Sequence, residues 1–187
     1  MKNLSRRNLP SLMNMEIMVT FKPIIKPTIK IEILDCSSKK VEVWNLFKRQ
    51  HYLTGNLNKS SRCFLACWNG IPVGFYAVLA MPCGSIKRAW RGHRLVVLAD
   101  YQGLGIGNRL AEWVAQTLVS EDKRFFAKTA NIKLGEYRNN SPKWRPTSKN
   151  MIRRKDHLKS KRNNYNNIVN KDLCMRICYS HEYVNEM

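Results

Sequence analysis

Three glycines within six residues mark the stretch of this 187-residue chain that is best suited to chemistry. The stretch runs from Gln102 to Gly107, with glycine at every second position from residue 103. Because glycine has no Cβ, successive backbone N–H groups at such a turn can point into one concavity. A helix that begins there adds the positive end of its dipole. The stretch is therefore typical of a pocket for a phosphate or a pyrophosphate, with a tight turn that binds nothing as the alternative.

The residues on either side of the glycines predict a strand before them and a helix after them. Leu95 to Ala99 is an unbroken apolar run of strand length, typical of a strand buried on both faces. Apolar residues then recur at helical spacing from Ile106 to Leu118. The turn is not a Walker loop, because no Gly-Lys-Ser/Thr follows, and its Gly-x-Gly-x-Gly spacing differs from the dinucleotide-binding fingerprint.

The turn resembles the signature of the GNAT superfamily of acetyl-CoA-dependent N-acetyltransferases, which reads Gln/Arg-x-x-Gly-x-Gly/Ala and is matched by Gln102, Gly105 and Gly107. This resemblance implies an α+β fold with a mixed, mostly antiparallel central sheet flanked by helices. It implies transfer of an acetyl group from acetyl-CoA, as co-substrate, to a primary amine by direct attack in a ternary complex, without a metal. The acceptor is left open between a small amine, a protein amino group and an aminoacyl-tRNA.

The same resemblance implies which residues contact acetyl-CoA. The pantetheine arm is expected along the end of the fourth strand, where a backbone N–H would also hold the thioester carbonyl. The pyrophosphate is expected on the turn and the start of the helix, and an asparagine follows the fifth strand. The implied cofactor-binding residues are Val97, Leu98, Ala99, Gln102, Gly103, Leu104, Gly105, Ile106, Gly107, Asn108 and Asn131.

Two residues are predicted to be catalytic. Tyr137 lies near the place of the tyrosine that protonates the departing thiolate in many members, although its spacing from Asn131 is one residue short, and a buried structural tyrosine is the alternative. No carboxylate lies within the third or fourth strand, so His51, His93 and Asp100 are the candidate bases. We rank His51 first, because an ordinary histidine pKa near 6.5 suits a base at neutral pH. An amine that loses its proton to solvent is the other possibility.

The remaining elements follow the order of that fold. Alternating polar and apolar residues predict a first strand at 28–33, and Val41, Trp44 and Phe47 predict a helix. Asn69-Gly70 predicts a hairpin between two strand-like runs. Three later segments are predicted as a fifth strand, a short helix and a closing strand or hairpin: 124–130, 134–139 and 173–184. We expect one domain at 28–187, preceded by a poorly ordered basic extension at 1–27.

The charge of the chain indicates an acidic partner. Lysine and arginine outnumber aspartate and glutamate by 33 to 13, a net charge of +20. Between Lys143 and Arg162 nine basic residues accompany one acid, which predicts a mobile basic loop at 143–170. We expect this loop to contact RNA or another polyanion, with a solvated basic surface as the alternative. The leading function is the acetyltransferase; a non-catalytic nucleic-acid-binding protein or acyl-CoA sensor on the same scaffold is the second.

Cysteine spacing and the lack of long apolar runs bear on location. The six cysteines include two Cys-x-x-x-Cys pairs in strand-like segments, where residues four apart are about 13 Å apart. Such pairs cannot close a disulfide or share a zinc ion within one strand, so we expect free thiols in a reducing cytoplasm. No apolar run reaches the length of a signal peptide or a membrane span, and we expect no membrane association. The oligomeric state is not predicted.

Overall fold

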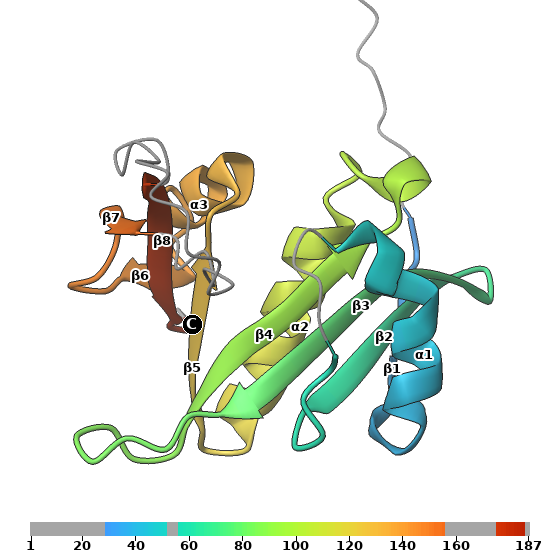
Figure 1. The fold of residues 1–187 in the computed structure, drawn as a ribbon, viewed down its shortest axis with the longest axis horizontal. Helices are drawn as coiled ribbons and strands as arrows, with labels where there is room; N and C mark the ends of the chain where they lie inside the picture. Colours follow the sequence, from blue (N-terminus) through green and yellow to red (C-terminus); the bar gives the residue numbers. More distant parts are fainter. Residues whose placement is uncertain (1–28, 52–55, 156–174, 186–187) are drawn as a thin grey trace, which may run out of the picture.

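The structure is a computed structural model that describes residues 29–51, 56–155 and 175–185. Within these residues the chain forms eight strands and three α-helices (Figure 1). The strands are β1 (Glu32–Asp35), β2 (Arg62–Trp68), β3 (Ile71–Ala80), β4 (Ala89–Val97), β5 (Arg124–Thr129), β6 (Trp144–Pro146), β7 (Ile152–Lys155) and β8 (Met175–Tyr183). The helices are α1 (Lys40–Phe47), α2 (Ile106–Ser120) and α3 (Ile132–Asn139), with 3-10 turns η1 (Ser37–Lys39), η2 (Lys48–Gln50) and η3 (Ala99–Tyr101).

The strands form one mixed sheet in the order β1-β2-β3-β4-β5-β8-β6, and β7 also pairs with β8. Every pairing is antiparallel except that of β4 with β5, which is parallel. The β2–β3 hairpin turns at Asn69 and Gly70, both with positive φ, as the Asn-Gly pair predicts. The sheet and its flanking helices confirm the predicted fold class.

Apolar residues pack on both faces of the sheet. On one face α2 buries Leu110, Val114 and Leu118 against β3 and β5. On the other face α1 buries Trp44 and Phe47 against β3. Two layers of helix thus hold the middle of the sheet from both sides, which keeps β4 in place at its centre (Figure 1).

β4 and β5 are hydrogen-bonded along only a short stretch. Their parallel pairing covers Ala89 to Arg91 on β4. Beyond it β4 continues to Val97 and β5 to Thr129, but the two strands no longer pair with each other. The register of β4 against β3 shifts at His93, the extra residue of a β-bulge. The two strands diverge from this point and leave an open wedge between them (Figure 1).

Two predicted strands have different bounds in the structure. β1 begins at Glu32 rather than at residue 28, and its four residues pair with Phe64 to Cys67 of β2. β4 begins at Ala89, well before the apolar run that starts at Leu95. The part of β4 before Leu95 contains Arg91, His93 and Arg94, so a search for apolar runs does not detect it.

The predicted loop at 143–170 contains two strands where the structure describes it. β6 and β7 both pair with β8, so residues 144–146 and 152–155 are not loop. Trp144 explains the ordering, because its buried ring packs edge-on against Tyr183 at 5.1 Å and Phe125 at 6.3 Å. The rest of that loop and the predicted extension at 1–27 lie outside the described residues. Of the helices that the structure describes, none has the length and apolarity to cross a membrane.

We expect Trp144→Ala to destabilise the protein by about 3–5 kcal/mol, since it empties a buried aromatic site. Trp113→Ala is the matched control, because Trp113 is 43% exposed on α2, and its removal should cost clearly less. Urea unfolding followed by fluorescence measures both. Equal losses in the two variants would show that Trp144 does not anchor β6.

Candidate functional site

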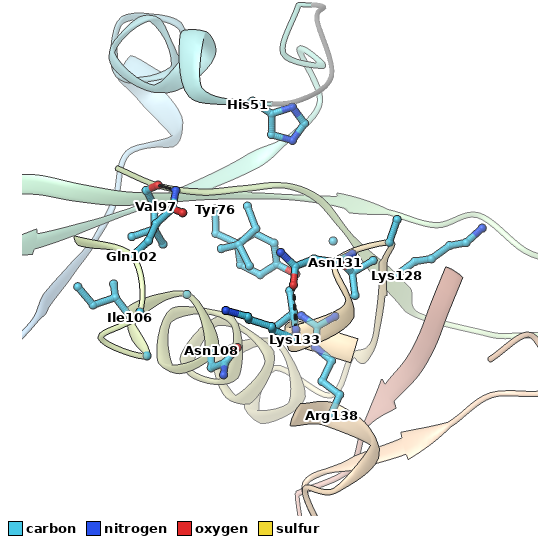
Figure 2. Close-up of a pocket in the computed structure, with 18 of the residues that line it drawn as sticks. His51, Tyr76, Val97, Gln102, Ile106, Asn108, Lys128, Asn131, Lys133 and Arg138 are labelled. Carbon is cyan, nitrogen blue, oxygen red and sulfur yellow. Dashed lines mark hydrogen bonds between the residues drawn. The ribbon is translucent and has the colours of Figure 1, made fainter. Parts of the chain in front are cut away.

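The wedge between β4 and β5 contains a cavity of about 830 Å³. Its walls come from β4, β5, the start of α2 and the N-terminal part of α3, and His51 closes it from beyond β4 (Figure 2). Lys128, Lys133 and Arg138 contribute cations, and no aspartate or glutamate of the described chain lines it. The cavity is therefore electropositive and suits a ligand that carries phosphates.

The glycine turn forms one end of this cavity. Gly103 and Gly105 have φ of 85° and 80°, and a Cβ at either would meet no protein atom within 4 Å. Gly105 is the N-cap of α2, so no side chain caps the first N–H groups of the helix. Those groups, from Ile106 to Asn108, begin at the cavity wall. Uncapped N–H groups at a helix N-terminus are what an anion requires, and that the turn binds one stays a prediction.

Side-chain hydrogen bonds hold the backbone that leads into the turn. The Gln102 side chain donates from Nε2 to the carbonyl oxygen of Val97 at 2.9 Å. The Gln50 side chain accepts from the Ala99 N–H at 2.8 Å, which ties η2 to η3. Gln102 therefore shapes the turn through its side chain.

The N–H groups of β4 that face the wedge can be identified from its pairing. The Leu98 N–H donates to Val73 at 3.0 Å, toward β3. Because successive residues of a strand alternate between its two edges, the N–H groups of Val97 and Leu95 point to the opposite, open edge. Both residues line the cavity. Leu98 and Ala99 donate elsewhere and do not line it.

The structure gathers most of the predicted cofactor-binding residues at the cavity. Those that line it are Val97, Gln102, Gly103, Gly105, Ile106, Gly107, Asn108 and Asn131. Leu98, Ala99 and Leu104 do not. Leu104 points outward and is 50% exposed, whereas Leu98 packs against the α1 core. Asn131 caps α3 by accepting from the Leu134 N–H at 3.0 Å, so its amide oxygen already has a partner.

The two predicted catalytic residues lie in different places. His51 is buried, lines the cavity and packs its ring edge-on to Trp44 at 5.7 Å. Tyr137 does not line the cavity, and its hydroxyl donates to Glu112 on α2. Burial and this bond raise the pKa of Tyr137 to about 12. Its role as general acid stays a prediction, and it would require the hydroxyl to leave Glu112.

His93 occupies the bulge at the opening of the wedge. Its Nε2 is buried with no hydrogen-bond partner in the described structure, and its side chain lines the cavity. Burial, followed by the charges of Arg94 and Arg91, lowers the pKa of His93 to about 4. The imidazole is therefore neutral at pH 7 and keeps a lone pair. Asp100, the third base considered from the sequence, does not line the cavity.

Sequence reasoning missed about half of the residues that line the cavity, among them two polar side chains from distant elements. Tyr76 reaches it from β3 and Arg138 from α3, and both are almost fully buried. Tyr76 stands inside an apolar strand and Arg138 in a polar helix, so neither has a local signal. No group of three or more metal-ligating side chains occurs among the residues that the structure describes.

Comparisons with known proteins agree with this geometry. Residues 59–143 match the family model of an acetyltransferase (GNAT) domain, a range that runs from β2 to α3. A GNAT family acetyltransferase from Elizabethkingia anophelis, solved with acetyl-CoA bound, superposes with a TM-score of 0.58 at 17% identity, covering 83% of this chain and 98% of the other.

Two further solved structures have the same fold. An IAA acetyltransferase from Bacillus cereus ATCC 14579 has a TM-score of 0.58 at 15% identity, covering 82% of this chain and 99% of the other. Arabidopsis thaliana Naa50, in complex with a bisubstrate analogue, has a TM-score of 0.56 at 17% identity, covering 83% of this chain and 99% of the other. No curated protein matches the sequence. The match to the family model confirms the predicted resemblance over residues 59–143, and the solved structures confirm the fold.

We expect Gly105→Ala to weaken acetyl-CoA binding roughly 10- to 10²-fold, the loss of one hydrogen bond to a charged group at about 1.5–3 kcal/mol. The positive φ of Gly105 strains any residue that has a Cβ, and relief of that strain would shift the N–H groups that begin α2. Gly70→Ala is the matched control: φ is 75° with equally open space, but the residue lies in the β2–β3 turn. Calorimetric titration of the folded variants with acetyl-CoA measures both affinities. If Gly105→Ala and Gly70→Ala both bind like the parent, the pyrophosphate lies elsewhere.

Proposed function

We propose, because residues 59–143 match the family model of a GNAT acetyltransferase domain, that this protein transfers the acetyl group of acetyl-CoA to a primary amine by direct attack in a ternary complex. The observation that carries the proposal is the cavity in the β4–β5 wedge, with a glycine cradle at one end and unpaired strand edges along its sides. The proposed unit is residues 28–187, which contain every described element.

The residues of the cavity fit acetyl-CoA along its length. The backbone of Gln102 to Asn108 would hold the pyrophosphate, with Lys133 adding positive charge. The N–H groups of Val97 and Leu95 would donate to the amide carbonyls of the pantetheine arm, which would take the place of a neighbouring strand. Acetyl-CoA supplies an activated acetyl group, and an N–H of the open β4 edge would polarise its carbonyl.

The two faces of the sheet suggest separate routes for the two substrates. Asn108, Lys133 and Arg138 lie on one side of β4 and His51 on the other (Figure 2). We place acetyl-CoA on the side of α2 and α3, and the amine on the side of His51. His51 would accept the proton that the attacking amine must lose. His93 stands at the bulge between the two routes and is the alternative base.

The geometry of the cavity does not determine which class of amine is the acceptor. Arabidopsis thaliana Naa50 was solved with the bisubstrate analogue CoA-Ac-MVNAL, and a ribosomal-protein-S18-alanine N-acetyltransferase from Escherichia coli has the same fold at a TM-score of 0.56 and 12% identity. A protein amino terminus is therefore one candidate. An acetyl-CoA-dependent release of thiol with a panel of small amines, peptides and aminoacyl-tRNA tests the proposal. Acetyl-CoA binding without thiol release from any of them would favour a sensor.

We expect His51→Gln to lower kcat/KM by about 10²- to 10⁴-fold, the usual contribution of general base catalysis. The measurement is thiol release across pH, with His93→Gln in parallel. If His93 is the base, activity declines only as pH falls toward about 4, because its pKa is lowered to that value and the imidazole is neutral above it. If only His93→Gln lowers kcat/KM, the role of general base belongs to His93.

A polyanionic partner is a further part of the proposal. β7 carries three consecutive basic residues, Arg153 to Lys155, on a strand that pairs with β8. Arg153 is exposed, and the nine basic residues between 143 and 162 continue this charge along the sequence. Phosphates bound there would release counterions. We propose that this segment contacts RNA, with a location in the reducing cytoplasm that suits the free thiols of the described cysteines.

We expect replacement of Arg153, Arg154 and Lys155 by glutamine to weaken tRNA binding and to make its dependence on salt shallower by about three counterions. Replacement of three exposed lysines elsewhere, Lys30, Lys39 and Lys59, removes the same charge and should change binding less. Acetyl-CoA affinity should stay at the parent value in both. If the parent protein does not bind tRNA at low salt, a small or peptidic amine becomes the leading acceptor.

A further inference from the structure

Tyr76 places a phenol at the closed end of the wedge. Its side chain is 3% exposed and lines the cavity from β3. A Cβ built on Gly92 would overlap its hydroxyl, so the hydroxyl lies directly over Gly92. Gly92 comes between Arg91, the last residue of β4 paired with β5, and the bulge at His93. The hydroxyl therefore stands where the two strands begin to part.

Arg138 determines whether the Tyr76 hydroxyl acts as a hydrogen-bond acceptor or donor toward its neighbours. Its guanidinium lies beside the Tyr76 phenol, whose pKa burial raises and this charge lowers, and packs over the Trp144 ring at 4.5 Å, and the residue is 2% exposed. Within the described residues it makes no ion pair with a carboxylate. A guanidinium can only donate hydrogen bonds. It must bind the phenol oxygen as acceptor, which leaves the O–H hydrogen of Tyr76 available to the cavity.

We propose that Tyr76 is the general acid that protonates the thiolate of coenzyme A as it leaves, and that Arg138 is its positioning residue. This inference rests on the proposed function. The amine nitrogen forms a bond to the acetyl carbon, the carbon–sulfur bond breaks, and its electron pair goes to sulfur. The Tyr76 O–H proton then moves to sulfur and gives a free thiol. The amine proton leaves through the base or water, and Tyr76 regains a proton from solvent.

Burial and Arg138 act in opposite directions on the acid strength of the Tyr76 phenol. Burial raises the pKa of Tyr76 to about 12, while Arg138 pulls the pKa in the opposite direction. The charge of Arg138 stabilises the phenolate until it is reprotonated.

Tyr137 is the competing tyrosine. Its hydroxyl already donates to Glu112, and the same carboxylate receives the Lys143 side chain at 3.2 Å. Tyr76 lines the cavity, and its hydroxyl donates to no partner among the described residues, whereas Tyr137 lies outside the cavity wall. The geometry therefore favours the tyrosine of β3 over that of α3.

The experiment compares Tyr76→Phe with Tyr183→Phe. Tyr183 has a buried hydroxyl that donates to Gln116 at 3.1 Å, in the same core but away from the cavity. We expect Tyr76→Phe to lower kcat by about 10²- to 10⁴-fold with acetyl-CoA affinity near the parent value. Tyr183→Phe should keep the parent kcat. Tyr137→Phe is measured with them.

A binding measurement supports the assignment independently of turnover. Calorimetry compares coenzyme A with desulfo-coenzyme A, in which hydrogen replaces the thiol. The parent should prefer coenzyme A by roughly 2- to 12-fold, the value of one neutral hydrogen bond to sulfur, and Tyr76→Phe should lose this preference. Gly92→Ala, which displaces the hydroxyl without removing it, should behave like Tyr76→Phe. It decides the matter if Tyr76→Phe does not fold.

Three results would overturn the assignment. One is parent-like kcat and parent-like preference for coenzyme A in Tyr76→Phe. Another is a loss of kcat confined to Tyr137→Phe, which would return the role to that residue. The third is failure of the parent to bind acetyl-CoA at all, which removes the proposed function together with this inference. Acetyl-CoA binding with no role for Tyr76 would overturn the inference alone.

Discussion

The early parting of β4 and β5 is the constraint on which the rest of this structure depends. A continuous parallel pair would place the backbone donors of β4 in a ladder with β5 and leave no space between the strands. The bulge at His93 ends that pairing after Arg91. The strand edges that remain open, the cavity between them and the access to it from both faces all follow from this one irregularity.

Neighbouring elements hold the wedge open at set positions. α2 packs beneath β3 and β5, and Gln50 and Gln102 tie the end of β4 to the segments beside it. On the far side β5 pairs with β8, which in turn pairs with β6 and β7. Each wall of the cavity therefore belongs to a packed unit, and the glycine turn joins the wall of β4 to the start of α2.

The parts of the site that the sequence predicted are local in the chain. The glycine turn, the strand before it and α2 are contiguous, so their residue types alone indicate an anion cradle. Tyr76 and Arg138 meet only because β3 and α3 fold together, and no spacing in the sequence reports that contact. Trp144 was hidden for a related reason: a three-residue strand among basic residues has no periodicity, and only packing against Tyr183 reveals it.

Gly92 and Tyr76 occupy one volume between them, since a Cβ on the glycine would overlap the hydroxyl of the tyrosine. Gly135 and Tyr179 are related in the same way, with a Cβ on Gly135 overlapping the Tyr179 ring. During evolution, a substitution at one residue of such a pair is therefore constrained as long as the other residue is unchanged. In diverging relatives, a side chain gained at the glycine should accompany a shorter residue in place of the tyrosine. The two pairs are thus coupled positions, whose substitutions are expected together in evolution.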